Sequence, residues 1–196
     1  MKLTKALTII FLIFFFHNFV KADDIRDFEI EGISIGDSAL KYFSEDEIIS
    51  NIRKNSYIGS DGLFFDAQFK DNNYELYEQV SLAFKKYDKK YIIYSLGGLI
   101  FYDNNKKKCI SDHKKIGKDI EKLFPNHKKN IINSKHRDDP TGKSLVYGIT
   151  LLDKTYSGAE VSCYTWSEEM NLHDYVIVAI DNSEFGQWLQ NYYNNL

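Results

Sequence analysis

Apolar and polar residues alternate along several short stretches of the chain, and this alternation predicts β-strands. Period-2 alternation places one side of a strand against a core and leaves the other side to water. The stretches are residues 28–35, 63–69, 77–85, 91–102, 144–152, 160–166 and 172–180. Turn residues such as Asp71-Asn72-Asn73 separate them, so we expect the last six to form an antiparallel sheet. Gly97-Gly98, inside one stretch, predicts a bulge or a tight bend.

A spacing of three and four residues marks the central helix. This helix is predicted over residues 105–124, ends at Pro125, and has an inner stripe of Cys109, His113, Ile116, Ile120 and Leu123. Ser44-x-x-Glu47 has the spacing of a capping box, which predicts a shorter helix over about residues 45–54.

A last helix is predicted after Asp181-x-x-Glu184, with one apolar stripe made by Phe185, Trp188, Leu189 and Tyr192. Strands in a run, with helices before, between and after them, are typical of the α+β class. The predicted fold is an antiparallel sheet of about six strands, packed by the central amphipathic helix and the C-terminal helix.

The first 22 residues follow the order of a secretory signal peptide. Lys2 and Lys5 are followed by the apolar stretch 7–16 and by the small-residue end Val20-Lys21-Ala22. We expect cleavage after Ala22 and a mature single domain over residues 23–196. No later stretch is long and apolar enough to span a bilayer, so the mature protein is predicted to be periplasmic or secreted, with no transmembrane span.

Charge is distributed unevenly along the mature chain. Without the three lysines of the leader there are 22 basic and 28 acidic residues, a net charge of −6, which argues against a nucleic-acid binder. Residues 105–143 nevertheless carry 12 basic and 5 acidic side chains. This basic segment is predicted to face an anionic envelope surface, an acidic partner protein or the acidic flanks of the same chain. The candidate contacts on its helix are Lys107, Lys114, Lys115 and Lys118.

The mature chain contains two cysteines, Cys109 and Cys163. Export places them where disulfides persist, so we expect a bridge that closes a loop of about 55 residues. The alternative is a pair of separate buried thiols.

Two short motifs imitate catalytic or nucleotide-binding sites. Gly36-Asp37-Ser38 is similar to the nucleophile motif of GDS-type hydrolases, but no histidine follows an aspartate at the required spacing, so Asp37 or Ser38 is predicted to cap a helix. Residues 140–144 match only the end of a P-loop and predict a turn. The histidines lack metal-ligand spacing, and no motif predicts a cofactor.

Three segments carry a resemblance to a known group of proteins: residues 35–44, 93–98 and 163–166. With them the chain resembles uncharacterised exported proteins of small-genome planktonic alphaproteobacteria, over most of its mature length. That resemblance implies export and a shared fold, but no reaction. The turn at residues 36–38, leading into a short helix, is also similar to small periplasmic domains of the BamE and beta-lactamase-inhibitor type.

Two hypotheses of function follow. The first is a non-enzymatic envelope protein that binds a macromolecule or a small ligand through the basic helix and through aromatic residues such as Tyr164 and Trp166. The second is a periplasmic hydrolase with a dispersed site, built from His173 with Asp174 or from the His136–Asp139 loop. A deep pocket with converging catalytic groups favours the hydrolase, and a flat basic or aromatic face favours binding.

Overall fold

A computed structural model describes residues 25–53 and 62–194, and the predicted signal peptide, residues 1–22, lies outside the described residues. Its main feature is a sheet of the strands β3 (Phe64–Phe69), β4 (Gln79–Lys85), β5 (Ser95–Phe101), β6 (Lys128–Lys135), β7 (Leu145–Leu152), β8 (Gly158–Thr165) and β9 (Tyr175–Asp181). The α-helices within these ranges are α2 (Glu45–Ser50), α3 (Lys106–Leu123) and α4 (Ser183–Asn194). Short 3-10 helices are η2 (Ile25–Asp27), η3 (Ala39–Lys41) and η4 (Glu168–Met170).

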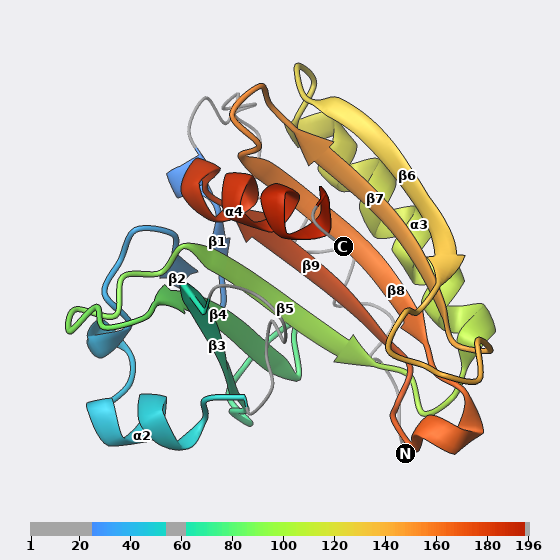
Figure 1. The fold of residues 1–196 in the computed structure, drawn as a ribbon, viewed down its shortest axis with the longest axis horizontal. Coiled ribbons are helices and arrows are strands. Elements are labelled where there is room, and N and C mark those ends of the chain that lie inside the picture. The colour runs from blue at the N-terminus through green and yellow to red at the C-terminus, as the bar shows by residue number, and fades with distance from the viewer. Residues whose placement is uncertain (1–24, 54–61, 195–196) are drawn as a thin grey trace, which may run out of the picture.

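The seven strands lie in the order β3-β4-β5-β9-β8-β7-β6, and all neighbours are antiparallel. The chain forms the meander β3–β5, crosses to the far edge of the sheet through α3, and returns through β6, β7 and β8. The last strand, β9, then fits between β8 and β5 (Figure 1). This arrangement confirms the predicted α+β class with an antiparallel sheet.

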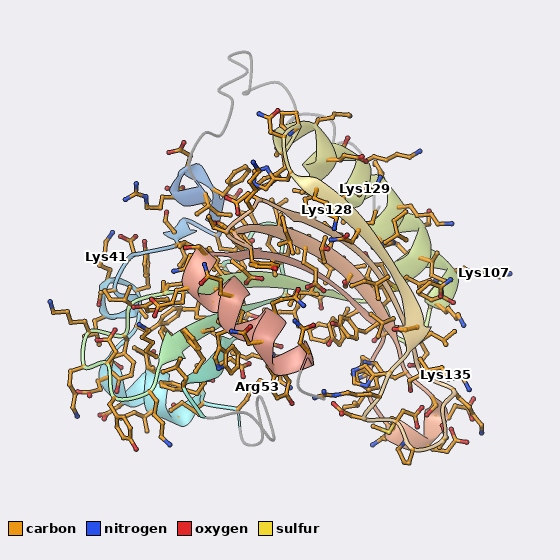
Figure 2. All side chains as sticks on the ribbon, turned by 45° about the horizontal axis from the view of Figure 1, so that its top comes forward. Lys41, Arg53, Lys107, Lys128, Lys129 and Lys135 are labelled. Carbon is orange, nitrogen blue, oxygen red and sulfur yellow. A yellow bond between two sulfur atoms is a disulfide. The ribbon has the colours of Figure 1, made fainter. Side chains whose placement is uncertain are left out.

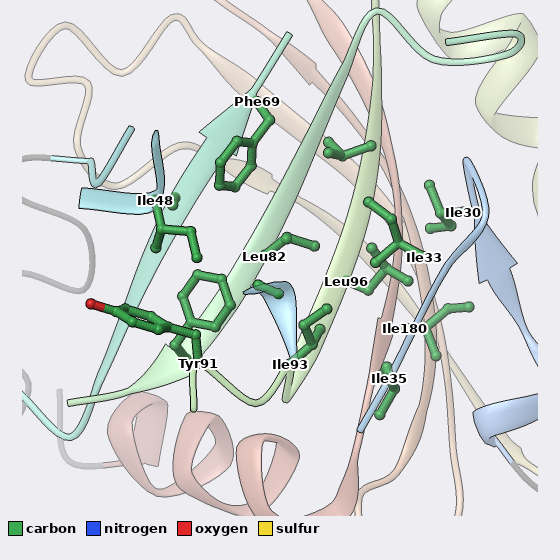
Figure 3. Close-up of a cluster of buried hydrophobic side chains, with 14 residues drawn as sticks. Ile30, Ile33, Ile35, Ile48, Phe69, Leu82, Tyr91, Ile93, Leu96 and Ile180 are labelled. Carbon is green, nitrogen blue, oxygen red and sulfur yellow. The ribbon is translucent and has the colours of Figure 1, made fainter. Parts of the chain in front are cut away.

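Alternate residues of β4 show which elements cover each face of the sheet. Val80, Leu82 and Phe84 belong to a buried cluster with β1 (Glu29–Ile30), β2 (Ile33–Ser34), η3 and α2 (Figure 3). Ala83, on the opposite face, packs with Phe185 and Trp188 of α4. Because strand side chains alternate between faces, α4 lies on the face opposite to this N-terminal layer.

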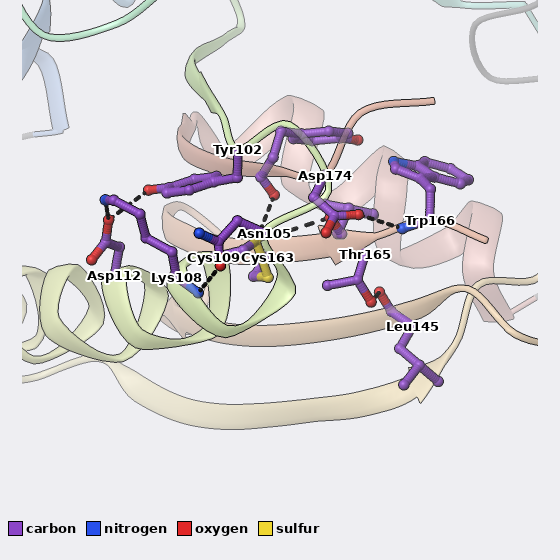
Figure 4. Close-up of a disulfide and its surroundings, with 12 residues drawn as sticks. Tyr102, Asn105, Lys108, Cys109, Asp112, Leu145, Cys163, Thr165, Trp166 and Asp174 are labelled. Carbon is purple, nitrogen blue, oxygen red and sulfur yellow. Dashed lines mark hydrogen bonds and ion pairs between the residues drawn. A yellow bond between two sulfur atoms is a disulfide. The ribbon is translucent and has the colours of Figure 1, made fainter. Parts of the chain in front are cut away.

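Helix α3 packs on β8, β7 and β9 on the same face as the N-terminal layer. Its inner stripe carries Cys109, which forms a disulfide with Cys163 of β8 (Figure 4). The predicted bridge is therefore confirmed, and both half-cystines are fully buried. Such a bond is compatible with a periplasmic or extracellular location.

The number of strands in the sheet and the form of residues 28–35 differ from the prediction. The sheet has seven strands rather than about six, because the polar stretch 128–135 forms the edge strand β6. Residues 28–35 do not form one strand but fold back as the hairpin β1–β2, since Glu31 and Gly32 take positive φ angles in the turn.

The predicted bulge at Gly97-Gly98 is wrong, because both residues pair in continuous register with β4 and β9. A Cβ atom at Gly98 would lie 2.4 Å from the ring of Tyr77. Glycine is thus needed there because an aromatic ring lies directly on the strand. In the part of the chain that the structure describes, no helix has the length and apolar character required to cross a membrane.

Candidate functional site

The face of the sheet beneath α4 is hollowed into a cleft of about 510 Å³. Its floor is formed by side chains of β6, β7, β8 and β9, among them Ile132, Val146 and Thr150. One wall is α4, with Leu189 and Gln190, and the other elements around it are the β6–β7 loop and the β7–β8 turn. The cleft therefore combines an apolar middle with polar groups at both ends.

The helix α4 is held over the sheet at one side of the cleft. Phe185 and Trp188 anchor it on Phe64, with ring centroids 5.2 and 5.1 Å from that of Phe64. Gly186 lies so close to the β7–β8 turn that a Cβ atom there would come within 2.0 Å of the Tyr156 carbonyl oxygen. The absence of a side chain at this one position thus allows the helix to rest on the turn.

Two carboxyl groups, Glu160 of β8 and Asp181 of β9, lie in the cleft. Gly158 is the residue directly opposite Asp181, so Glu160 is its diagonal neighbour on the same face. Ser162 donates a hydrogen bond of 2.5 Å to Oε1 of Glu160. Asp181 is only 8% exposed, and its Oδ1 has no hydrogen-bond partner among the described residues.

The surroundings of this pair favour the protonated acids. Burial raises the pKa of Asp181 to about 7, and the charge of Glu160 acts in the same direction, while a hydrogen bond with Ser95 acts against it. Burial also raises the pKa of Glu160, against the opposing effect of the Ser162 hydroxyl. Asp181 therefore changes its charge with small changes in pH near neutrality.

Gly148 of β7 leaves the room that the Glu160 hydrogen bond needs. It lies opposite Ser162 in the β7–β8 register, and a Cβ atom there would come within 2.6 Å of the Ser162 hydroxyl oxygen. Any larger residue at position 148 would displace the hydroxyl that holds Glu160 in place.

Aromatic residues gather at the other end of the cleft. Tyr164, a candidate contact from the sequence, lines the cleft and stacks on Tyr175 with ring centroids 4.8 Å apart. The His136 ring lies 5.7 Å from Tyr164 and 4.4 Å from Trp166, so it joins the two predicted aromatic contacts. Burial lowers the pKa of His136, and its Nδ1 accepts a hydrogen bond from the Asp138 backbone, so the ring is neutral at pH 7.

The only guanidinium among the residues that line the cleft, that of Arg137, stands at this aromatic end. Arg137 donates a 2.8 Å hydrogen bond to the Tyr192 hydroxyl and pairs with Asp138 at 3.2 Å. Its position is thus fixed between α4 and the β6–β7 loop.

The predicted lysine contacts lie on a different face from the aromatic ones. Lys107, Lys114, Lys115 and Lys118 are exposed on α3, whereas Tyr164 lines the cleft on the other side of the sheet. Figure 2 shows Lys107 on the outside of α3. Within the described ranges the ion pairs of the basic segment join two of its own residues, except for the pair of Lys143 with Glu169 of the acidic C-terminal part.

The acids of the hydrolase hypothesis have structural partners. Asp139 is buried and accepts hydrogen bonds from the backbone and hydroxyl groups of both Thr141 and Ser144. Asp174, also buried, accepts a 2.8 Å hydrogen bond from the Trp166 backbone (Figure 4). His173 is exposed and lies 3.6 Å from the exposed Asp103. Both buried acids are thus held by hydrogen bonds from neighbouring backbone and hydroxyl groups.

Sequence reasoning missed the carboxyl pair. Asp181 was predicted to lead the last helix, but the side chain that caps the helix is that of Asn182, which accepts a 2.9 Å hydrogen bond from the Phe185 backbone. Glu160 stood at the start of a predicted strand, where alternation alone suggests a solvated side chain. One signal was available: an acidic residue directly after the apolar run 175–180.

Among the described residues there is no group of three or more histidine, cysteine or acidic side chains that could hold a metal ion. No family model matches the chain, and no curated protein or solved structure matches it either. The resemblance to exported alphaproteobacterial proteins therefore stays a prediction.

Proposed function

We propose that this protein is an exported, non-enzymatic binding domain that takes a small ligand into the cleft between α4 and the sheet. The observation that carries the proposal is the unpartnered Oδ1 of Asp181, which is buried at the floor of an open cleft. A buried acceptor without a donor costs about 1–3 kcal/mol, and a bound ligand that supplies a donor removes this cost. The apolar side chains Ile132, Val146 and Leu189 provide surface for the rest of such a ligand.

A screen by two-dimensional ¹H–¹⁵N NMR tests this proposal. The mature protein is mixed with a library of small cations, anions and neutral molecules, and the expected result is that at least one class shifts the amide signals of cleft residues. Ile132→Trp fills the cleft and is expected to abolish these shifts. Ile131→Trp is the matched control, because Ile131 directly precedes Ile132 in the same strand, is 75% exposed and points away from the cleft.

The proposal is wrong if no compound shifts the cleft signals, or if Ile132→Trp binds as well as the unaltered protein. A binding signal that maps to the outer face of α3 instead would also count against it.

A second candidate function is contact with an anionic envelope surface through α3. Its support is that Lys107, Lys114, Lys115 and Lys118 are exposed and form no ion pair with another described residue. Co-sedimentation with vesicles containing an anionic phospholipid is expected to fall severalfold when all four lysines become glutamine. The matched control changes four exposed lysines elsewhere to glutamine: Lys86, Lys89, Lys90 and Lys154. Equal loss in both variants would reject a role for α3.

A further inference from the structure

We propose that the ligand of the cleft carries a protonated amine, which binds between the carboxylates of Glu160 and Asp181. This inference rests on the proposed binding function of the cleft and names the chemical class of its ligand. Three features of the cleft support it: the position of the two acids, the unsatisfied oxygen, and the distance to the nearest basic groups.

The two carboxyl groups are placed to reach one ligand group together. They stand on adjacent strands as diagonal neighbours on one face, a relation that separates Cα atoms by roughly 7–8 Å. Both side chains line the cleft. An ammonium group has three N–H donors, and it can therefore serve both carboxylates and still donate to a third acceptor.

The hydrogen bonds of the pair leave Oδ1 of Asp181 without a donor among the described residues. Glu160 is held by Ser162 at 2.5 Å, whereas Oδ1 of Asp181 has no partner although the side chain is more than nine-tenths buried. A carboxylate is an acceptor only, so the ligand must bring the hydrogen. A charged donor forms the stronger hydrogen bond with it.

Among the described residues that line the cleft, no basic side chain lies at this end. The basic groups among the lining residues are Lys135, His136 and Arg137, which follow β6 at the aromatic end. Tyr164, at that end, lies four positions after Glu160 along β8, a span of roughly 13 Å. Arg137 is already bonded to Tyr192 and Asp138. A cation from outside is thus the missing counter-charge.

Few other charges face Asp181. From β8 it faces Glu160, and from β5 the neutral Ser95, which forms a hydrogen bond with it. Helix α4 carries Glu184, which pairs with Lys85 of β4. The remaining titratable residues that line the cleft are Lys135, His136, Arg137, Asp138, Tyr156 and Tyr164. We therefore expect amine binding to respond to the ionisation of the carboxyl pair.

Binding is tested with three matched probes of one shape: phenethylamine, 2-phenylethanol and phenylacetate. An alkylamine keeps its proton up to about pH 10, as a lysine side chain does. We expect the amine alone to shift the NMR signals of residues 160 and 181, and its affinity to be at least tenfold higher at pH 8 than at pH 5.5. The affinity should rise with pH because burial raises the pKa of Asp181 to about 7, so this acid becomes charged between pH 5.5 and pH 8.

Two variants separate the acids from the rest of the cleft. Asp181→Asn is expected to weaken amine binding at pH 8 by at least tenfold and to remove most of its pH dependence. Asp138→Asn is the matched control, since Asp138 also lines the cleft but is exposed at the opposite end, and its effect is expected to be less than threefold.

Each alternative outcome has a distinct meaning. If the alcohol or phenylacetate binds in the cleft as tightly as the amine, the amine inference is wrong and the binding function stands. If none of the three probes shifts the cleft signals, the amine inference is also wrong, and the wider NMR screen decides separately whether the cleft binds anything. Equal affinity of the unaltered protein and Asp181→Asn for the amine would overturn the assignment of the site.

Discussion

Asp181 and Asp139 are both buried carboxyl groups, and their surroundings move their pKa values in opposite directions. Burial acts to raise the pKa in both cases. At Asp139 the hydrogen bonds from Ser144 and Thr141 outweigh burial and hold the pKa well below its usual range. At Asp181 burial outweighs the opposing hydrogen bond with Ser95, and the Glu160 charge adds a smaller contribution, so the pKa rises to about 7. The first aspartate closes a loop, and the second keeps an oxygen, Oδ1, without a hydrogen-bond partner among the described residues.

Replacement of Asp181 by asparagine should therefore stabilise the protein only at higher pH. The folded-state pKa of about 7 lies above the ordinary value of 3.8, so the contribution of Asp181 to stability falls as the pH rises from about 4 to 7. Asp181→Asn removes this loss and is expected to raise the free energy of unfolding by about 2–4 kcal/mol above pH 7, and by nearly nothing at pH 4. Urea denaturation at a series of pH values measures the difference. A constant difference at all pH values would contradict the assignment.

The role of Asp181 could not be predicted from the sequence. Asp181-x-x-Glu184 has helix-cap spacing, and only the structure shows that Asn182 provides the cap while Asp181 ends β9. Its partner Glu160 lies 21 positions earlier in the sequence, and their proximity depends on the pairing of β8 with β9. The local pattern alone, by contrast, predicted Asp37 or Ser38 as a helix cap, and Ser38 does accept a 3.3 Å hydrogen bond from the Leu40 backbone.

At the scale of elements, the disulfide fixes α3 to the middle of the sheet. It joins Cys109 of α3 to Cys163 of β8, 54 residues apart, within a buried cluster that includes Val161 and Val176. The double variant C109A/C163A is expected to lower the free energy of unfolding by about 2–4 kcal/mol, because the unfolded chain loses its loop constraint. Denaturation of both proteins under non-reducing conditions measures this. Equal midpoints would show that the bond contributes nothing.

The short helix α2 depends on its capping box. The Ser44 hydroxyl accepts from the Glu47 backbone, and the Glu47 carboxylate accepts a 2.8 Å hydrogen bond from the Ser44 backbone. Ser44→Ala is expected to cost about 1 kcal/mol of unfolding free energy. Ser50→Ala, at the other end of α2, is the control and should cost less than half as much. A larger effect at Ser50 would contradict this account of the helix.

Elements with one buried face were predictable, and β6 was not. The inner stripe of α3 and the alternation of β4 each leave a period in the sequence. Strand β6 is an edge strand whose residues are mostly exposed on both faces, so its sequence shows no alternation. Its lysines at both ends, Lys128, Lys129 and Lys135, are typical of edges that avoid pairing with other sheets.

At the scale of the whole molecule, the charge pattern and the fold place different chemistry on the two faces of the sheet. The basic residues of segment 105–143 gather on α3, β6 and the loops beside them. The acidic pair lies in the cleft on the α4 face. The sequence predicted the basic segment, because its residues are consecutive, whereas the cleft is assembled from four strands, a helix and two connecting segments.

The predicted signal peptide implies a mature protein with a defined first residue. When the full chain is expressed in a bacterium with a general secretion pathway, intact-mass spectrometry of the periplasmic fraction should give a protein that begins at Asp23 and contains the disulfide. Replacement of the apolar residues Leu12 and Phe14 by lysine should retain the full-length, reduced chain in the cytosol. A full-length chain that carries Met1 in the periplasm would contradict the predicted cleavage.

The most direct test of the cleft as a ligand site is a carboxyl ¹³C NMR titration of Asp181, with and without phenethylamine. The account predicts a pKa of about 7 for the free protein, since the group is buried beside Glu160, and a clear decrease when the amine is bound. A pKa near the ordinary 3.8, unchanged by the amine, would contradict it.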